Sequence, residues 1–233
     1  MRPVSGVLFD KDGTLFDFAA TWEAWCKRFL DQIADDSAHA TRLAAAIGFD
    51  YAAGQFMPGS VVVAGTPDQI AKTLLPDLPD LAEGDLIDIM NTAAAEALQV
   101  PAVPLAPLLG ELRGRGLCLG VATNDAEAPA RAHLDQAGVT DYFDFIAGFD
   151  SGYGGKPDAG QLLAFAAAVG HPPAALVMVG DSTHDLIAGR AAGMRCVGVL
   201  TGVAGRAELD AYAEAVFDDI SALPAWIEAQ SLT

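Results

Sequence analysis

The sequence predicts an α/β fold, namely a Rossmann-like three-layer α/β/α core with a parallel sheet plus a helical cap domain. An apolar strand is expected at residues 4–9. From residue 105 onward, short apolar segments alternate with helical segments, a pattern typical of parallel sheets covered on both faces. Between these regions lies a stretch with a mostly helical pattern, where a separate unit is expected.

That intervening stretch, residues 18–102, predicts the cap. Its first aromatic residues recur at helical spacing. Helices are expected at 19–33, 38–47, 68–74 and 83–98, and a short strand is possible at 60–63. A proline-rich linker then returns the chain to the core, so the core should comprise residues 1–17 and 103–233.

The core elements follow in regular order after the linker. Helices are expected at 105–115, 126–137, 159–169 and 185–192. The strands between them are expected at 117–122, 145–147, 176–179 and 196–200, with a last edge strand at 216–217.

Composition narrows the class of protein. The 233 residues carry 31 acidic and 13 basic side chains, a formal net charge of -18, which disfavours nucleic acid and anionic membranes as partners. Three cysteines without a CxxC pair fit a reducing compartment, and a cytoplasmic location is expected. There is no apparent signal peptide and no apolar stretch of the roughly 20 residues that span a bilayer. The chain could be a monomer or a homodimer.

Polar residues follow the predicted strands, and ligands of open α/β sheets bind at the carboxyl ends of strands. The first strand is followed by two carboxylates one residue apart, which suit phosphoryl chemistry in which one attacks and the other exchanges protons. The residues expected to converge are Asp10, Asp12, Thr123, Asn124, Lys156, Asp181 and Asp185.

Four motifs occur in order along the chain: FDKDGTLFD (9–17), VATND (121–125), GGKPD (154–158) and VGDSTHDLIAGRAAGM (179–194). In these motifs the sequence resembles the haloacid dehalogenase superfamily, specifically its phosphatases with a helical cap inserted after the first strand. The phosphoglycolate-phosphatase-like branch is the most similar. The match covers the whole chain in order.

The resemblance implies catalytic roles. Asp10 would be the nucleophile that forms an aspartyl-phosphate, and Asp12 would protonate the leaving alcohol and then deprotonate the hydrolytic water. Thr123 would bond a phosphate oxygen beside the backbone N–H of Asn124. Lys156 would neutralise charge on Asp10 and the phosphoryl group, since this chemistry needs positioning and charge neutralisation above all.

The resemblance also implies a Mg²⁺ site. Asp181 would bind the ion together with Asp10 and the backbone carbonyl of Asp12. Asp185 would hold the waters of the ion or orient Lys156. Oxygen ligands and retained waters suit Mg²⁺ as the cofactor.

The implied function is Mg²⁺-dependent hydrolysis of a small phosphorylated metabolite, with phosphoglycolate as the leading candidate. Asp12 favours phosphate esters over carbon–halogen or carbon–phosphorus bonds, because relatives acting on those bonds lack this carboxylate. Two alternatives remain open at this point. One is a phosphomutase of the same superfamily, and the other is a non-catalytic binding protein that keeps the fold.

Several residues favour a structural interpretation. Lys11 stands where relatives often have an apolar residue. Its charged end could pair with a nearby carboxylate, but we expect it to reach outward. His184 is expected to be structural rather than catalytic. In the segment 49–58, Tyr51, Gln55 and Phe56 are weaker candidates for a specificity loop that reaches the site.

The cap aromatics Trp22, Trp25 and Phe29 are expected to form the core of the cap rather than a ligand platform. A substrate with a second strong anion would need a basic residue of the cap. Lys27 or Arg42 is the candidate.

Overall fold

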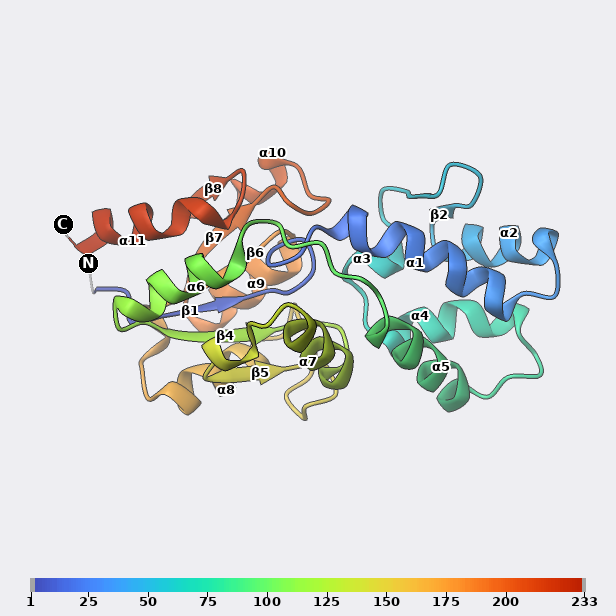
Figure 1. Cartoon of the computed structure of the whole chain (residues 1–233), viewed down its shortest axis with the longest axis horizontal. Helices are drawn as coiled ribbons and strands as arrows, with labels where there is room; N and C mark the ends of the chain where they lie inside the picture. The colour runs from blue at the N-terminus through green and yellow to red at the C-terminus, as the bar shows by residue number, and fades with distance from the viewer. Residues whose placement is uncertain (1–2, 232–233) are drawn as a thin grey trace.

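The computed structural model describes residues 3–231, and its larger unit is built on a parallel sheet (Figure 1). The sheet has six strands in the order β5-β4-β1-β6-β7-β8, all paired in parallel. The strands are β1 (Gly6–Phe9), β4 (Cys118–Ala122), β5 (Phe145–Ala147), β6 (Leu176–Gly180), β7 (Arg195–Val199) and β8 (Ala215–Phe217). The predicted α/β fold is confirmed.

Helices cover both faces of this sheet. One face packs against α6 (Leu105–Gly114), α7 (Glu127–Gln136) and α11 (Leu223–Ser231), and the other against α8 (Gly160–Val169) and α9 (Thr183–Ala192). Strand β1 shows the alternation that produces the two layers, because Val7 and Phe9 belong to one apolar cluster and Leu8 to the other. Short elements complete this unit: η2 (Thr140–Tyr142), η3 (Pro173–Ala175), α10 (Arg206–Leu209) and η4 (Ile220–Ala222).

The stretch after β1 forms a mostly helical unit with its own apolar cluster, at the right in Figure 1. It contains α1 (Phe18–Ile33), α2 (Ser37–Ala46), α3 (Val61–Ala64), α4 (Pro67–Leu74), η1 (Leu75–Asp77) and α5 (Glu83–Ala95). The unit also contains a two-stranded antiparallel hairpin made of β2 (Phe49–Asp50) and β3 (Gln55–Phe56). We refer to this unit as the cap; its exact domain limits stay a prediction.

The strand considered possible at 60–63 is wrong, because Val61–Ala64 is the short helix α3. Three consecutive valines favour a strand. However, the Ser60 hydroxyl accepts a hydrogen bond from the Val62 N–H and donates one to the carbonyl of Ile47, which starts a helical turn instead.

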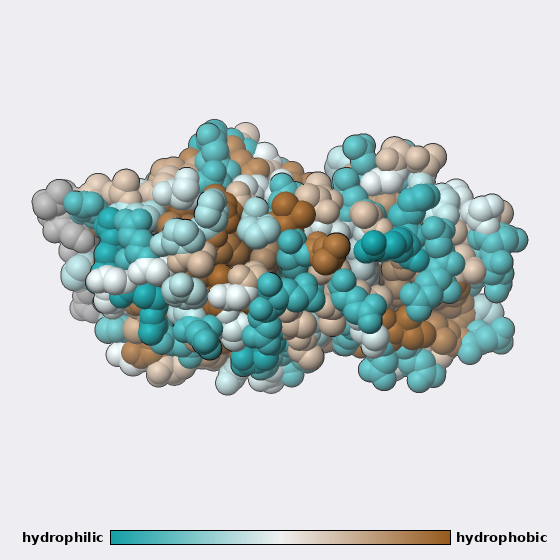
Figure 2. Space-filling view, viewed as in Figure 1, coloured by the Kyte–Doolittle hydropathy of each residue, from teal (hydrophilic) through white to brown (hydrophobic). Residues whose placement is uncertain are grey.

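The chain passes between the two units twice, and the two passages lie side by side. The backbone N–H of Asp17 donates to the carbonyl of Val100, and that of Ala102 donates to Leu15. The Asp17 carboxylate also caps α1 by accepting from the Ala20 N–H at 2.9 Å. In the space-filling view a waist separates the two units, and hydrophilic residues are spread over both (Figure 2).

The C-terminal helix α11 and the short helix α10 are not among the predicted elements. Pro224 falls in the first turn of α11, where the missing N–H of proline costs no helical hydrogen bond. Within residues 3–231, no helix is long and apolar enough to cross a membrane.

Candidate active site

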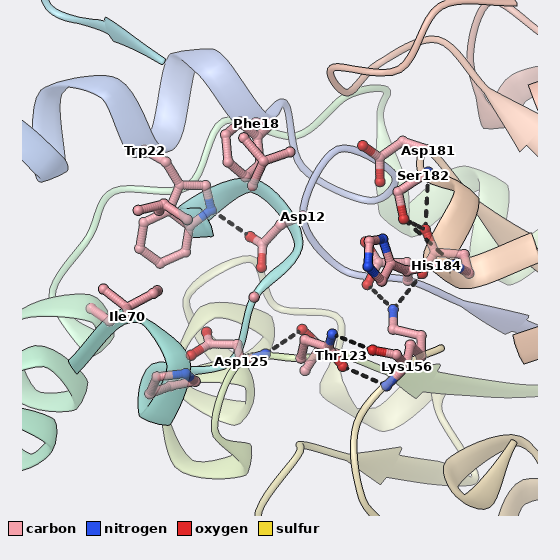
Figure 3. Close-up of a pocket in the computed structure, with 18 of the residues that line it drawn as sticks. Asp12, Phe18, Trp22, Ile70, Thr123, Asp125, Lys156, Asp181, Ser182 and His184 are labelled. Atoms are coloured by element: carbon pink, nitrogen blue, oxygen red, sulfur yellow. Dashed lines mark hydrogen bonds and ion pairs between the residues drawn. The ribbon is translucent and has the colours of Figure 1, made fainter. Parts of the chain in front are cut away.

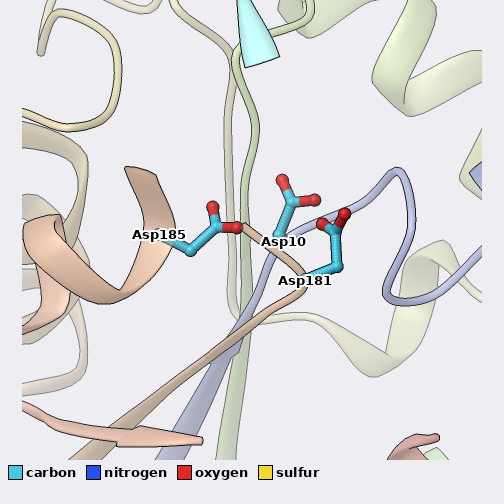
Figure 4. Close-up of side chains that lie close together, drawn as sticks. All are labelled: Asp10, Asp181 and Asp185. Carbon is cyan, nitrogen blue, oxygen red and sulfur yellow. The ribbon is translucent and has the colours of Figure 1, made fainter. Parts of the chain in front are cut away.

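Three buried carboxylates meet at the carboxyl edge of the sheet (Figure 4). Asp10 follows β1 and Asp181 follows the neighbouring strand β6, while Asp185 lies in the first turn of α9. One carboxylate oxygen from each residue lies within 4.8 Å of the others. Because β1 and β6 pair directly, their ends deliver Asp10 and Asp181 to the same point, as the sequence predicts.

The electrostatics of this cluster favour a bound cation. Burial, opposed by Lys156 and reinforced by the nearby Asp185 and Asp12, raises the pKa of Asp10 to about 7. Burial, followed by Asp185 and Asp10, raises the pKa of Asp181 well above its usual range. Facing carboxylates in a dry site repel one another unless a cation lies between them. An all-oxygen donor set of this kind fits Mg²⁺.

Lys156 brings the only positive charge that a described residue places directly against this cluster. Its Nζ contacts Asp10 Oδ1 at 2.5 Å and Asp185 Oδ1 at 2.6 Å, and it donates to the carbonyl of Ala122 at 2.8 Å. Burial disfavours the ammonium, but Asp10 and Asp185 outweigh that effect and raise the pKa of Lys156. Lys156 is therefore a fixed cation beside the Asp10 carboxylate.

The loop after β4 is tied to Lys156 through Asn124. The side-chain oxygen of Asn124 accepts from the Lys156 backbone N–H at 2.7 Å, and its amide nitrogen donates to the Lys156 carbonyl at 2.9 Å. The Thr123 hydroxyl accepts from the Asp125 N–H at 3.0 Å, which leaves its own proton available to a ligand. Both residues line the same cavity as the carboxylate cluster.

The Asp12 side chain turns away from the carboxylate cluster and toward the cap. Its Oδ1 accepts from the indole Nε1–H of Trp22 at 2.8 Å, and Lys11 Nζ lies 2.7 Å from its Oδ2. The turn directly after Asp12 needs Gly13, which has a φ of 83° and whose missing Cβ makes room for the Asp181 carboxylate. Of Asp12, only the backbone carbonyl remains a candidate ligand for a metal at the cluster.

The expectation that Lys11 reaches outward is wrong, because its side chain is 0% exposed, and the alternative of pairing with a nearby carboxylate is confirmed. Its ammonium contacts Asp12 and lies 3.3 Å from Asp125 Oδ2. It also donates to Nδ1 of His133 at 3.0 Å, so the other ring nitrogen of His133 donates to the carbonyl of Ala94 in α5 at 2.7 Å. Two carboxylates and an imidazole offset the cost of burying this charge.

Burial, followed by the Lys11 charge, lowers the pKa of His133 to about 4. Burial disfavours the charged form of Lys11, but Asp12 and Asp125 outweigh it and raise its pKa. The result is a neutral imidazole beside a charged ammonium. Through Trp22 and Ala94, this buried network also joins the sheet unit to the cap.

The cavity lies between the carboxylate cluster and the cap (Figure 3). Trp22, Phe18 and Ile70 lie on the cap side of this view, across from Lys156 and Asp181. His184 lines the same cavity, and within residues 3–231 its side chain makes no hydrogen bond. Its predicted structural role stays a prediction.

The cap aromatics serve two purposes. Trp22, Trp25 and Phe29 all belong to the buried apolar cluster of the cap, as predicted. Trp22 and Trp25 also line the cavity, whereas Phe29 stacks behind Trp25 with ring centroids 5.1 Å apart. Trp22 and Trp25 therefore belong both to the core of the cap and to the lining of the cavity, two roles predicted from the sequence as alternatives.

The cap residues proposed to reach the substrate do not line the cavity. Lys27 Nζ lies 3.5 Å from the ring centroid of Tyr51 and donates to the Tyr51 carbonyl, and Arg42 is exposed on α2. Gln55 and Phe56 form the hairpin strand β3, where Phe56 packs against other cap aromatics. The hairpin packs against the cap rather than over the cavity, because its aromatic side chains Phe49 and Phe56 pack in the apolar cluster of the cap.

The sequence does not predict the polar partners of three residues of the site. Trp22 donates to Asp12, His133 accepts from Lys11, and the Gln161 amide donates to the carbonyls of Thr123 and Gly154. Each lies within an amphipathic helical pattern that explains it equally well as a packing residue. The one sequence signal for this network is the basic residue Lys11 at an often apolar position, for which pairing with a nearby carboxylate is the less favoured expectation.

Comparison with known proteins agrees with this geometry. A family model described as haloacid dehalogenase-like hydrolase matches residues 4–193. The chain therefore belongs to the haloacid dehalogenase-like hydrolases. Its sheet, with an inserted helical unit and an acidic cluster at the strand ends, is consistent with that membership.

Individual relatives point in the same direction. The chain is 38% identical to a phosphoglycolate phosphatase of Rhodospirillum rubrum over 120 residues, covering 52% of this chain and 50% of that protein. This match thus spans only about half the length of that relative. A phosphoglycolate phosphatase of Agrobacterium fabrum is 29% identical over 97% of this chain and 94% of its own length. The fold is shared with CbbY of Rhodobacter sphaeroides, with a TM-score of 0.71, 24% identity, and coverage of 94% and 96%.

Proposed function

We propose that this protein is a Mg²⁺-dependent phosphatase that hydrolyses a small phosphate monoester through an aspartyl-phosphate on Asp10. One observation carries the proposal. Asp10, Asp181, Asp185 and Lys156 are buried together at the carboxyl edge of the sheet, with a cavity in front of them. A buried nucleophile flanked by a fixed cation and a set of metal-binding carboxylates is what phosphoryl transfer requires.

Each residue of the site has a separate role in the proposed reaction. The Asp10 carboxylate attacks phosphorus while Lys156, held by Asp185 and the Ala122 carbonyl, offsets the charge of both groups. The Thr123 hydroxyl donates a hydrogen bond to a phosphoryl oxygen. The Asp10, Asp181 and Asp185 carboxylates would hold Mg²⁺, which when bound neutralises phosphoryl charge and orients the ester.

Asp12 is proposed to exchange protons with the leaving group. The Asp12 carboxyl transfers a proton to the alcohol oxygen as the ester bond breaks. It then takes a proton from the water that attacks the aspartyl-phosphate. Trp22 and Lys11 fix its position at the border between the sheet unit and the cap, where a leaving alcohol would lie.

The experiment is phosphate release from a panel of small phosphate monoesters, with phosphoglycolate included because the relatives are named for it. Each ester is tested with Mg²⁺ and with chelator, and Asp10→Asn is the control. Mg²⁺-dependent release that Asp10→Asn abolishes supports the proposal. Folded protein that releases no phosphate from any ester would contradict it.

The same experiment separates the two rival functions. A phosphomutase would convert one phosphate ester into an isomeric one without releasing phosphate. A non-catalytic binding protein would bind an ester without altering it, and Asp10→Asn would leave its cellular role intact. The intact set of Asp10, Asp12, Thr123, Lys156 and Asp181 favours catalysis over that second rival.

A further inference from the structure

The cavity has two chemically different walls. The wall from the sheet unit is polar and holds the carboxylates and Lys156. The wall from the cap is almost entirely apolar, and Figure 3 shows Trp22, Phe18 and Ile70 on that side. The cap residues that line the cavity are Phe18, Trp22, Trp25, Val62, Val63, Gly65, Pro67, Ile70, Met90, Asn91 and Ala94.

No described basic side chain of the cap belongs to that wall. Lys27 is engaged by Tyr51, and Lys72 is exposed and lies 3.8 Å from Glu83. Arg28 and Arg42 are exposed to solvent. A second anion on the substrate would thus lose its water at this wall without gaining an ion pair, which is strongly unfavourable.

The acidic residues at the border between the two walls would also repel a second anion of the substrate. Asp12 and Asp125 both line the cavity there, and the ammonium that they share, Lys11, is fully buried behind them. Two carboxylates face one ammonium, so this border carries no spare positive charge. A carboxylate on the leaving group would meet acidic side chains before it reached the apolar wall.

The aromatic part of the wall is rigid. Trp25 stacks on Phe29 with an interplanar angle of 4° and meets Trp22 nearly edge-on at 88°. Both tryptophans are only 7% exposed. Fixed aromatic rings give a flat apolar group a contact surface with little entropy to lose.

We infer that the substrate is a phosphate monoester of a neutral, largely apolar alcohol, aromatic or branched aliphatic, rather than an ester with a second anion such as phosphoglycolate. This inference rests on the proposed function, because it assumes that the phosphoryl group lies against Asp10. The alcohol then points to the cap wall. Asn91, the one uncharged amide on that wall, can meet a single polar group of the alcohol.

The test compares three esters. Phosphoglycolate is measured against its neutral isostere 2-oxopropyl phosphate and against the larger benzyl phosphate, as kcat/KM with Mg²⁺. We expect both neutral esters to exceed phosphoglycolate by about tenfold or more, as for other pockets that leave a polar group unpaired. Phosphoglycolate turnover equal to or faster than both, lost in Asp10→Asn, would overturn the inference while leaving the proposed function intact.

Binding provides a second readout that does not depend on turnover. The same three esters are titrated into Asp10→Asn with Mg²⁺ by calorimetry. Because the change at Asp10 affects the common phosphoryl group of all three, their order of affinity still reports on the cap wall. Tighter binding of the two neutral esters supports the inference even if no ester is hydrolysed, and tighter binding of phosphoglycolate overturns it.

A matched pair of variants locates the selectivity. Asn91→Arg places a cation on the cap wall, and Thr92→Arg places the same cation on the exposed side of α5, one residue away. We expect Asn91→Arg to shift the preference toward phosphoglycolate, relative to benzyl phosphate, by about tenfold. Thr92→Arg should leave the preference unchanged. An Asn91→Arg enzyme with wild-type preference would contradict the assignment of this wall to the alcohol.

Discussion

The hydrogen bond from Trp22 to Asp12 gives the sharpest test of the proposed acid. Trp22→Phe keeps an aromatic ring in the cap cluster but removes the Nε1–H that lies 2.8 Å from Asp12 Oδ1. Lys11 still contacts both oxygens of the carboxyl group, at 2.8 Å and 2.7 Å. The substitution therefore removes one of the contacts that position the Asp12 carboxyl group and leaves its contacts with Lys11 in place.

The size of the effect follows from these contacts. A hydrogen bond to a charged group contributes about 1.5–3 kcal/mol. Since the two Lys11 contacts remain, we take the lower end, about 1.5 kcal/mol, which corresponds to a roughly tenfold loss of rate. The loss should appear in kcat for esters whose alcohol needs a proton to depart. It should be much smaller for p-nitrophenyl phosphate, whose leaving group departs without one.

The assay is steady-state phosphate release from benzyl phosphate and p-nitrophenyl phosphate. Trp25→Phe is the matched control, because the indole N–H of Trp25 has no hydrogen-bond partner within residues 3–231 while its ring still packs on Phe29. Trp22→Phe should lower the rate on the benzyl ester relative to p-nitrophenyl phosphate, whereas Trp25→Phe, which alters the cap wall for both aromatic esters, should leave that ratio unchanged. An equal loss on both esters would refute the positioning of Asp12 by Trp22.

Three further predictions concern the metal and the buried charges. Burial raises the pKa of Asp10 from 3.8 to about 7, so without metal its contribution to stability is full below about pH 4 and is lost as the pH rises through 7. Mg²⁺ binds the ionised form, so the increase in Tm on adding Mg²⁺ should be larger at about pH 8 than at about pH 5.5; equal increases would count against this site. Lys11→Met removes the ammonium shared by the half-buried carboxylates of Asp12 and Asp125 and should lower the free energy of unfolding in urea by about 3–5 kcal/mol, whereas Lys27→Met in the cap should cost about 1 kcal/mol or less. Gly202→Ala would place a Cβ against the Asp181 carboxylate, and should weaken Mg²⁺ binding about 10- to 100-fold by calorimetry, with unchanged affinity as the contrary result.

The sheet unit is predictable from the sequence because its signals are local. Asp10, Thr123 and Asp181 each directly follow a short apolar run. A parallel sheet brings such positions to one edge whatever lies between the strands. The convergence of these residues with Lys156 could thus be inferred without knowing any individual contact.

The cap wall and the Lys11 network depend instead on contacts between distant segments. The burial of Lys11 depends on its contacts with Asp125 and His133, and no local sequence pattern predicts these contacts. In the cap, the Ser60 hydrogen bonds override the strand preference of the valines that follow. Helical spacing predicted that Trp22 is buried, but it could not predict that the indole N–H points at Asp12.

The paired passages between the two units bear on the order in which the chain can fold. Strand β1 precedes every other element, yet Gly6 pairs with Cys118 on one side and Leu176 on the other. Such distant pairings form slowly, whereas the helical contacts of the cap are closer in sequence. The bond from Asp17 to Val100 joins the two ends of the cap, so a cap that folds first shortens the loop that the pairing of β1 with β4 must close. The inserted unit would then act as a folding clamp, bringing the central strands β1 and β4 together before the rest of the sheet exists.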